Sequence, residues 1–265
     1  LGGVAGVLRG RVYLCGGVGD WGQIIECFNP RRQEWETTRP APRLSTPRCL
    51  AAAVAVNGRL YVCGGEAYAN DAVHSSVEYF DPISARCEEL PAMMRAPRNN
   101  LAAAALLGED TALVVCGGCS APPSLIGTPG ARRALETAEM LNLSGGSSAW
   151  QDLAPMSTPR QSHAAVALHG SVYAIGGYDG LGLDHSGVER FDLQDGSWFP
   201  LSPMSVPRVG LVAGAVCGRI FVVGGQTWGV AAFRDGERFD TLRHAWGPAA
   251  RLEHGRCYHC AAGVK

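Results

Sequence analysis

Two Cys-X-X-Cys pairs have the spacing of a metal or redox site. They are Cys116 with Cys119, in the sequence CGGC, and Cys257 with Cys260, in the sequence CYHC. A structural zinc ion needs four ligands that converge on one point, and these two pairs lie far apart in the chain. A thioredoxin-like motif needs a helix start, and no helical pattern accompanies either pair. We therefore expect no metal ion, and only Cys119, in a loop, is a candidate for a redox-sensing thiol.

Glycine pairs after hydrophobic stretches raise a second possibility, phosphate binding. The first two copies read RVYLCGG at 11–17 and RLYVCGG at 59–65. A nucleotide-binding loop requires its glycines to open a helix. No helical periodicity follows any of the pairs, so the glycines are predicted to mark a structural repeat.

The histidines show no pattern typical of catalysis. No HExxH motif, no Ser/His/Asp order and no pair of carboxylates on one element stands out in the chain. His163 occupies a strand position that recurs along the chain, which favours a structural role. His74, His185, His254 and His259 fall in or near loops. We predict a protein that is not an enzyme, with no catalytic residues and no cofactor.

The glycine pairs belong to a repeat that runs through the whole chain. They stand at 16–17, 64–65, 117–118, 176–177 and 224–225, at intervals of 48, 53, 59 and 48 residues. Four further columns recur in step with them. An apolar residue precedes each pair by three positions: Tyr13, Tyr61, Val114, Tyr173 and Phe221. A glutamate follows each pair, two residues before an apolar side chain: Glu26, Glu78, Glu139, Glu189 and Glu237.

The other two columns close one repeat and open the next. The closing column is mostly tryptophan: Trp35, Cys87, Trp150, Trp198 and Trp246. The opening column is mostly Pro-Arg: Pro47-Arg48, Pro97-Arg98, Pro159-Arg160, Pro207-Arg208 and Gly255-Arg256. Because charges are rarely buried unpaired, we expect each repeated glutamate to pair with an arginine of the opening column.

Each repeat reads as four short antiparallel strands. The first strand is rich in alanine, as in AAAVAV at 51–56, and two-residue turns such as Asn57-Gly58, His169-Gly170 and Cys217-Gly218 connect it to the second. The glycine pair ends the second strand, the glutamate lies in the third and the tryptophan in the fourth. Four-stranded units repeated radially make a β-propeller, in which only small residues fit the inner strands near the axis. The fold class predicted is therefore all-β.

These columns resemble those of the kelch repeat, and the resemblance covers nearly the whole chain. Cys87 in place of a tryptophan, Val114 in place of a tyrosine and Gly255 in place of a proline are local departures. The resemblance implies the substrate-recognition propeller of a BTB–BACK–kelch protein, which serves a cullin-RING ubiquitin ligase as its adaptor. The cullin would bind an unseen BTB region, which would also form any homodimer. The alternative is a cytoskeletal, actin-associated kelch scaffold with no ligase role, and a copper-radical oxidase is the known catalytic use of kelch blades.

The domain predicted at 1–265 divides into five repeats and one extra strand. The repeats are expected at about 1–46, 47–96, 97–158, 159–206 and 207–254, with a closing strand at 255–265. Strands equivalent to the first strand of a repeat are predicted at both ends of the chain, at Leu1–Arg9 and at Arg256–Val264. The intact protein is therefore expected to have six blades, with three strands missing here, and a closed ring of five blades is the alternative.

Binding residues are expected in the loops at one mouth of the propeller. Aromatic residues follow the glycine pairs closely: Trp21, Tyr68, Tyr178 and Trp228. A second set follows each Pro-Arg pair by two positions: Leu50, Asn100, Ser162, Gly210 and Tyr258. The long loop Ser120–Ala134 is expected to stand as a wall beside the mouth, and Arg132, Arg133 and Arg234 could supply positive charge. By the resemblance, kelch proteins that capture acidic peptides carry arginine in the second set, so a mixed apolar and polar peptide is expected here.

Composition argues against two classes of partner. The chain has 23 basic and 24 acidic residues, so its net charge gives no sign of nucleic-acid binding. No apolar stretch reaches the length of a membrane span. The first residues, LGGVAGVLRG, include no initiator Met and no signal-peptide pattern, which favours a part of a longer chain. Cysteines inside apolar strands favour a reducing compartment, and the cytoplasm is the expected location.

Overall fold

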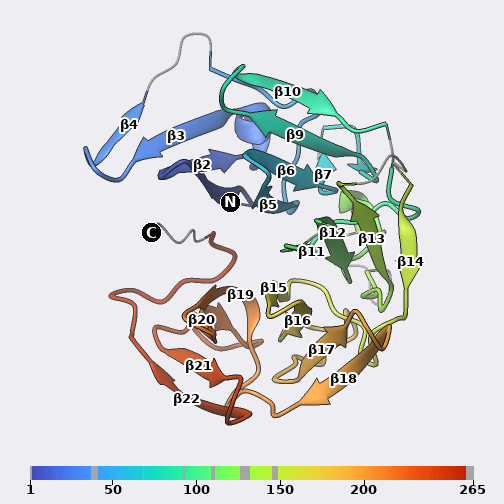
Figure 1. Ribbon diagram of the computed structural model, residues 1–265, viewed down its shortest axis with the longest axis vertical. Coiled ribbons are helices and arrows are strands. Elements are labelled where there is room, and N and C mark those ends of the chain that lie inside the picture. Colours follow the sequence, from blue (N-terminus) through green and yellow to red (C-terminus); the bar gives the residue numbers. More distant parts are fainter. Residues whose placement is uncertain are drawn as a thin grey trace.

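Five four-stranded antiparallel sheets follow one another around a central axis (Figure 1). The computed structural model describes residues 2–36, 41–67, 69–91, 93–108, 111–125, 132–144 and 149–260. Each sheet is one sequence repeat, and we call the sheets blades 1 to 5 in chain order. The arrangement confirms the predicted all-β propeller. No helix in these described ranges has the length and apolar character needed to cross a membrane.

The blades share one strand order from the axis outward. Blade 1 consists of β1 (Val4–Leu8), β2 (Arg11–Cys15), β3 (Ile25–Asn29) and β4 (Glu34–Glu36). Blade 2 consists of β5 (Ala52–Val56), β6 (Arg59–Cys63), β9 (Val77–Asp81) and β10 (Arg86–Glu89). Blade 3 consists of β11 (Ala102–Leu106), β12 (Ala112–Cys116), β13 (Ala138–Asn142) and β14 (Gln151–Leu153). Blade 4 consists of β15 (Ala164–Leu168), β16 (Ser171–Ile175), β17 (Val188–Asp192) and β18 (Ser197–Leu201). Blade 5 consists of β19 (Val209–Val216), β20 (Arg219–Gln226), β21 (Gly236–Asp240) and β22 (Ala245–Ala249).

Three small elements lie in the loops that follow the glycine pairs. They are the 3-10 helices η1 (Gly19–Gln23) and η2 (Pro123–Leu125) and the hairpin of β7 (Glu66–Ala67) with β8 (Ala72–Val73). The sequence did not predict this hairpin, because strands of two residues leave no periodicity to detect.

Small side chains let the inner strands approach one another. The alanine-rich strands β1, β5, β11, β15 and β19 pack side by side in that order around the axis (Figure 1). In blades 1, 2, 4 and 5 the hairpin turn has two residues with positive φ: Asn57 and Gly58, for example, have φ angles of 50° and 74°. In blade 3 the connection from β11 to β12 is longer. Two consecutive positive φ angles define the turn that matches the twist of paired strands.

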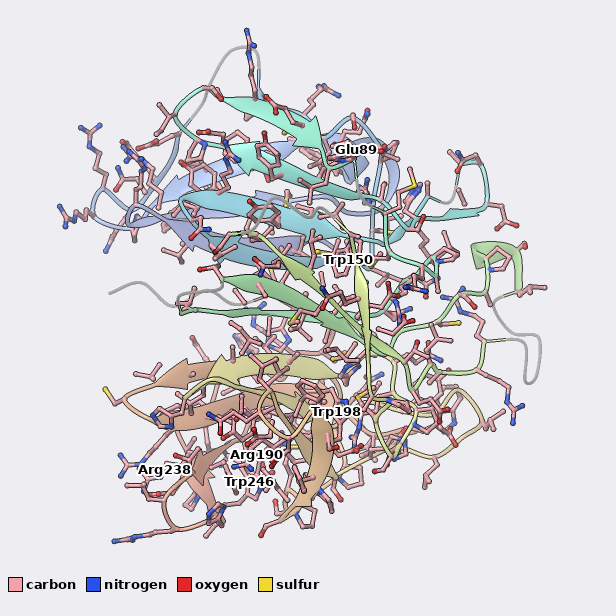
Figure 2. The ribbon with its side chains drawn as sticks, turned by 45° about the vertical axis from the view of Figure 1, so that its right-hand side comes forward. Glu89, Trp150, Arg190, Trp198, Arg238 and Trp246 are labelled. Carbon is pink, nitrogen blue, oxygen red and sulfur yellow. The ribbon has the colours of Figure 1, made fainter. Side chains whose placement is uncertain are left out.

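The closing column packs against the apolar residue that follows each glutamate. The rings of Phe191 and Trp198 lie 5.2 Å apart, and those of Phe239 and Trp246 also lie 5.2 Å apart. Figure 2 shows Trp150, Trp198 and Trp246 at the outer side of three successive blades. Large rings thus pack at the wide part of blades 1, 4 and 5, as the taper of a propeller favours.

The predicted ion pair forms inside four of the five blades. The closest distances between guanidinium nitrogen and carboxylate oxygen are 2.8 Å for Arg48–Glu78, 2.6 Å for Arg98–Glu139, 3.0 Å for Arg160–Glu189 and 3.1 Å for Arg208–Glu237. All four arginine side chains are almost completely buried. Blade 1 differs, because Glu26 is exposed and, within the described ranges, no arginine occupies the matching position.

Successive blades are joined at their glycine pairs. The amide of the second glycine donates to the carbonyl of the arginine that opens the next repeat, at 2.8 Å for Gly17–Arg48 and 2.7 Å for Gly65–Arg98. The same bond joins Gly225 to Arg256 at 2.8 Å. The C-terminal segment 255–260 is therefore bound to blade 5 as each blade is bound to the one before it.

The expected closing strand Arg256–Val264 does not appear in its described part. Residues 256–260 have no strand partner, and 261–265 lie outside the described residues. The segment lies between blades 5 and 1 (Figure 1). Within the described residues, β19 and β1 do not pack as the other neighbouring inner strands do. Strand structure requires a paired neighbour, and the segment has none there.

Candidate functional site

One end of the propeller carries the glycine pairs and the connections between blades, and we call it the mouth face. The chain enters each inner strand from this end, and each second strand returns to it. The loops after the glycine pairs therefore gather on the mouth face, while the two-residue turns lie at the opposite end. Figure 1 shows the blades arranged around this axis.

A ring of backbone hydrogen bonds surrounds the axis at the mouth. Each residue of the second predicted set donates its amide to the carbonyl of the equivalent residue one blade earlier, as from Asn100 to Leu50 at 2.8 Å and from Ser162 to Asn100 at 2.9 Å. Gly210 and Tyr258 continue the series, and Leu50 begins it by donating to Gly2 at 3.0 Å. All six residues have positive φ angles, between 49° and 79°. The series thus contains six positions for five blades.

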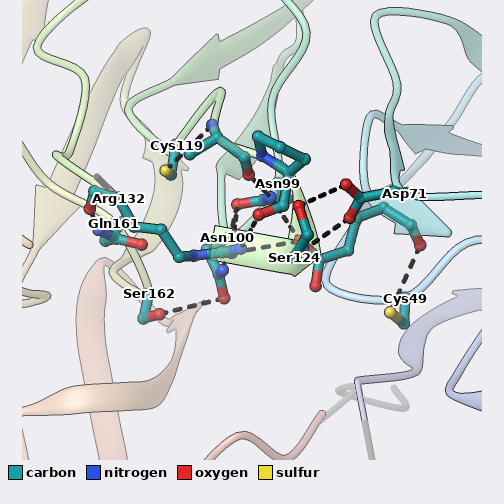
Figure 3. Close-up of polar contacts among 12 residues, drawn as sticks. Cys49, Asp71, Asn99, Asn100, Cys119, Ser124, Arg132, Gln161 and Ser162 are labelled. Carbon is teal, nitrogen blue, oxygen red and sulfur yellow. Dashed lines mark hydrogen bonds and ion pairs between the residues drawn. The ribbon is translucent and has the colours of Figure 1, made fainter. Parts of the chain in front are cut away.

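The side chains of this ring surround a shallow central cavity of about 200 Å³. The Ser162 hydroxyl donates to Asn100 Oδ1 at 3.2 Å (Figure 3). Burial raises the pKa of Tyr258, which opposes ionisation of its hydroxyl. The lining below is mostly alanine from the inner strands. The centre of the mouth is therefore an uncharged polar rim over an apolar floor.

His163 lies beside this cavity as a structural residue. Its side chain is buried, and its Nε2 lies 3.4 Å from Cys116 Sγ. Burial, together with the positive charge of Arg160 and an unfavourable interaction with His185, lowers the pKa of His163 to about 3. The imidazole is therefore neutral at physiological pH.

His163 should make the stability of the chain depend on pH. Its pKa in the unfolded chain is about 6.5, so below that pH the unfolded chain binds a proton that the folded chain refuses. The contribution of the neutral His163 to the free energy of unfolding is therefore fully present above the unfolded-state pKa and is lost as the pH falls toward 3. We expect His163→Leu, the residue found at the equivalent positions 101 and 211, to reduce the loss of unfolding free energy between pH about 7 and 4. Urea unfolding across this range tests it, and an unchanged slope would contradict it.

The aromatic residues predicted for the loops differ in exposure. Trp21, on η1, has 60% of its surface exposed and Trp228 has 91%. Tyr178 is partly buried, because its backbone pairs with Gln161 in both directions at 3.0 Å. Tyr68 lies outside the described residues. The two tryptophans are thus the best placed of the four to meet a partner.

The three arginines predicted to supply positive charge differ in their contacts and exposure. Arg132 is held by its neighbours: its guanidinium donates to Glu66 Oε2 and Asn99 Oδ1, both at 3.2 Å, and its carbonyl accepts from Gln161 Nε2 at 2.6 Å (Figure 3). Arg133 and Arg234 are exposed. Arg132 therefore joins the loops of blades 2, 3 and 4, and the other two supply the accessible charge. The middle of the loop predicted as a wall, residues 126–131, lies outside the described residues.

Sequence reasoning missed the polar groups that tie these loops together. Glu66 is completely buried and accepts a hydrogen bond from Asn99. Asp71 accepts bonds from the backbone and the hydroxyl of Ser124, which links the loops of blades 2 and 3 (Figure 3). These residues occur in one repeat each, so no recurring column could reveal them. A charged residue directly after a glycine pair, as at Glu66, was the available signal.

The buried cysteines lie in an environment that suppresses thiol chemistry, whereas Cys217 and Cys260 are exposed. All ten are free, and Cys15, Cys63 and Cys116 are completely buried. Cys119, the candidate redox sensor, is only 1% exposed, and burial raises its pKa. A thiol with a raised pKa is a poor nucleophile, so the structure disfavours a sensor role. In the described residues, no three His, Cys, Asp or Glu side chains are grouped to hold a metal ion.

Taken together, the blades and their mouth define a β-propeller whose repeats carry the glycine pair, the Arg–Glu ion pair and the closing tryptophan. The model of the Kelch motif matches residues 47–94, 159–205 and 207–252, which is more than half of the chain. The chain belongs to the kelch-repeat family.

Similar proteins extend well beyond the region matched here. Mouse Kelch-like protein 23 is 35% identical over 88 residues, covering 32% of this chain and 15% of that protein. Mouse Kelch-like protein 35 is 27% identical over 188 residues, covering 70% of this chain and 28% of that protein. The solved structure of YjhT shares the fold, with a TM-score of 0.78 over 98% of this chain and 86% of that one, at 16% identity.

Proposed function

We propose that this propeller is a protein-interaction module that binds a peptide or protein partner on its mouth face. The exposure of Trp21 and Trp228 on loops around an uncharged polar centre carries this proposal. Aromatic side chains supply a large contact area at little entropic cost and dominate many protein interfaces. The uncharged centre favours a partner segment of mixed apolar and polar character.

We further propose that the propeller recognises substrates for a cullin-RING ubiquitin ligase in the cytoplasm. The similarity to Kelch-like proteins 23 and 35, of which this region spans 15% and 28%, supports a larger protein in which further domains act. In this proposal a BTB–BACK region outside residues 1–265 binds the cullin and forms the homodimer. The propeller then holds the substrate and performs no chemistry itself.

The intact protein is proposed to have a sixth blade at the position of the C-terminal segment. The six positions of the axial ring and the Gly225–Arg256 bond support it. Glu26 and Arg256 are both exposed, unlike their equivalents in the other blades, and both line a cavity of about 510 Å³ at this seam. A sixth blade would supply a glutamate to Arg256, and the connection from that blade to blade 1 would supply an arginine to Glu26, completing the column of ion pairs.

The mouth can be tested with a variant of the full-length protein that carries Asn100→Arg and Ser162→Arg. Two arginine side chains, much larger than the asparagine and serine that they replace, should fill the central cavity and exclude the partner segment. The matched control is Asn57→Arg with His169→Arg, since these exposed residues have the same positive φ at the opposite end. Proteins that bind the wild type and the control, but not the mouth variant, are the expected result in affinity capture with mass spectrometry.

Two results would overturn parts of this proposal. Identical partners for the mouth variant and the control would exclude the mouth as the binding site. Capture of actin or other cytoskeletal proteins without a cullin would replace the ligase role with that of a cytoskeletal scaffold. A cullin retained on all three proteins supports the adaptor role, because its site lies outside the propeller.

A further inference from the structure

Four exposed apolar residues stand on two loops at the mouth. They are Leu181 and Leu183 after β16 and Trp228 and Val230 after β20, with 55%, 61%, 91% and 52% of their surface exposed. We call them the blade 4–5 patch. The amide of Trp228 donates to Asp184 Oδ2 at 2.7 Å, so Trp228 lies beside the residue that follows Leu183. Contiguous exposed apolar surface of this kind marks interaction sites.

Local hydrogen bonds hold the blade 4 loop in the conformation that exposes its leucines. Asp179 Oδ1 accepts from the amides of Leu181 at 2.7 Å and Leu183 at 3.0 Å. A β-carbon on Gly180 would lie 2.1 Å from the carbonyl of Arg132, so the loop lies directly against the neighbouring one. The loop is therefore preorganised, which reduces the entropy lost on binding.

The loop after β20, which carries Trp228, is held by a turn of its own and by the close approach of Gly255. Val230 donates its amide to the carbonyl of Thr227 at 3.1 Å, which closes a turn around Trp228. A β-carbon on Gly255 would lie 2.0 Å from the carbonyl of Ala232. This approach explains why glycine replaces the proline of the opening column at position 255. The tryptophan is thus exposed on a loop that is packed at both ends.

Two exposed arginines lie near the patch, while its own two carboxylates are engaged by backbone amides. Arg133 is exposed, and the amide of the next residue, Ala134, donates to the carbonyl of Asp179 at 2.9 Å. Arg234 is exposed further along the loop that carries Trp228. The two carboxylates of the patch, Asp179 and Asp184, both accept bonds from backbone amides. A partner that covers the patch therefore meets apolar side chains, with an exposed arginine on each of two adjoining loop segments.

We propose that the blade 4–5 patch binds a segment of a protein partner that presents two or three large apolar side chains flanked by aspartate or glutamate. The inference rests on the proposed function and specifies the partner of the mouth face. Trp228 and the two leucines provide the apolar contact, and Arg133 and Arg234 pair with the flanking carboxylates. The charge complementarity selects this segment over a purely apolar or a basic one.

The test uses the 265-residue chain and a phage library of random dodecapeptides. We expect the selected peptides to share large apolar residues next to acidic ones. Trp228→Ser, or Leu181→Ser with Leu183→Ser, should weaken the binding of a selected synthetic peptide at least about tenfold. Ile83→Ser and Leu242→Ser are the matched controls, since these leucine-sized residues are 71% and 89% exposed on turns at the opposite end.

A thermodynamic cycle tests the charges separately. Replacing the acidic residues of the selected peptide by their amides should weaken binding to the wild type, and should change binding little when Arg133→Ala and Arg234→Ala are present. Selected peptides without acidic residues, or binding unaffected by Trp228→Ser, would overturn the inference. If those peptides are still rejected by the Asn100→Arg, Ser162→Arg variant, the proposed function stands without the patch. Failure to select any peptide would count against both.

Discussion

Replacing Arg48 with alanine should lower the free energy of unfolding by about 3–5 kcal/mol, because it leaves a completely buried carboxylate without its cation. Arg48 donates to Glu78 Oε1 at 2.9 Å, to the carbonyls of Gly64 and Ser76 at 2.8 and 3.0 Å, and to Ser76 Oγ at 2.6 Å. Both charged side chains have no exposed surface. The variant loses the ion pair and the three other hydrogen bonds that Arg48 donates.

The control for this experiment is an ion pair at the surface. Arg11 and Glu36 lie 2.9 Å apart, but 42% and 28% of their side chains are exposed. Water solvates these charges when the partner is removed, so Arg11→Ala should shift the midpoint of urea unfolding far less than Arg48→Ala. Equal shifts in the two variants would show that the repeated ion pair contributes no more than its surface counterpart.

Replacing Gly64 with alanine should lower the free energy of unfolding by a comparable amount, because the added β-carbon strains the backbone. Gly64 has a φ of 61°, and a β-carbon there would lie 2.3 Å from the carbonyl oxygen of Arg98. The left-handed conformation costs a residue with a side chain about 1–2 kcal/mol, and forcing packed groups apart costs about 1–3 kcal/mol more. Blades 2 and 3 would have to separate where Gly65 donates to Arg98. Thermal or urea unfolding measures the loss.

The variant Gly58→Ala separates the cost of the left-handed conformation from the cost of forcing the two blades apart. Gly58 has a φ of 74°, but no atom lies within 4 Å of the position of a β-carbon. This variant should therefore show only the conformational cost, about 1–2 kcal/mol. If Gly64→Ala were no worse than Gly58→Ala, the close approach between blades would carry no energetic weight.

Residues that recur in every repeat could be predicted from the sequence, together with the fold that they build. The pairing of Arg48 with Glu78 followed from two columns that repeat in step, since a buried charge needs a partner and each repeat offered one of each sign. The alanine-rich inner strands and the Asn57-Gly58 turn were predicted in the same way. Contacts between residues far apart in the sequence could be predicted here, because the same residue types recur in each repeat.

The loops could not be predicted to the same extent, because their contacts join residues that occur once. Arg132 was expected to supply positive charge at the mouth, yet it pairs with Glu66 in the loop of another blade, and residue types alone do not reveal such a pair. Tyr178 was predicted from its place after a glycine pair, but its exposure depends on pairing with Gln161. Trp228 was predicted as a binding residue, while its bond to Asp184 required the structure.

The bond between each glycine pair and the following arginine has a consequence for protein synthesis. The amides of Gly17, Gly65, Gly118, Gly177 and Gly225 each depend on an arginine carbonyl that is translated later. A nascent chain can therefore complete the mouth end of one blade only after the next repeat has begun to leave the ribosome. A premature stop codon early in one repeat, before its arginine, would remove that blade and also leave the preceding one without its last partner.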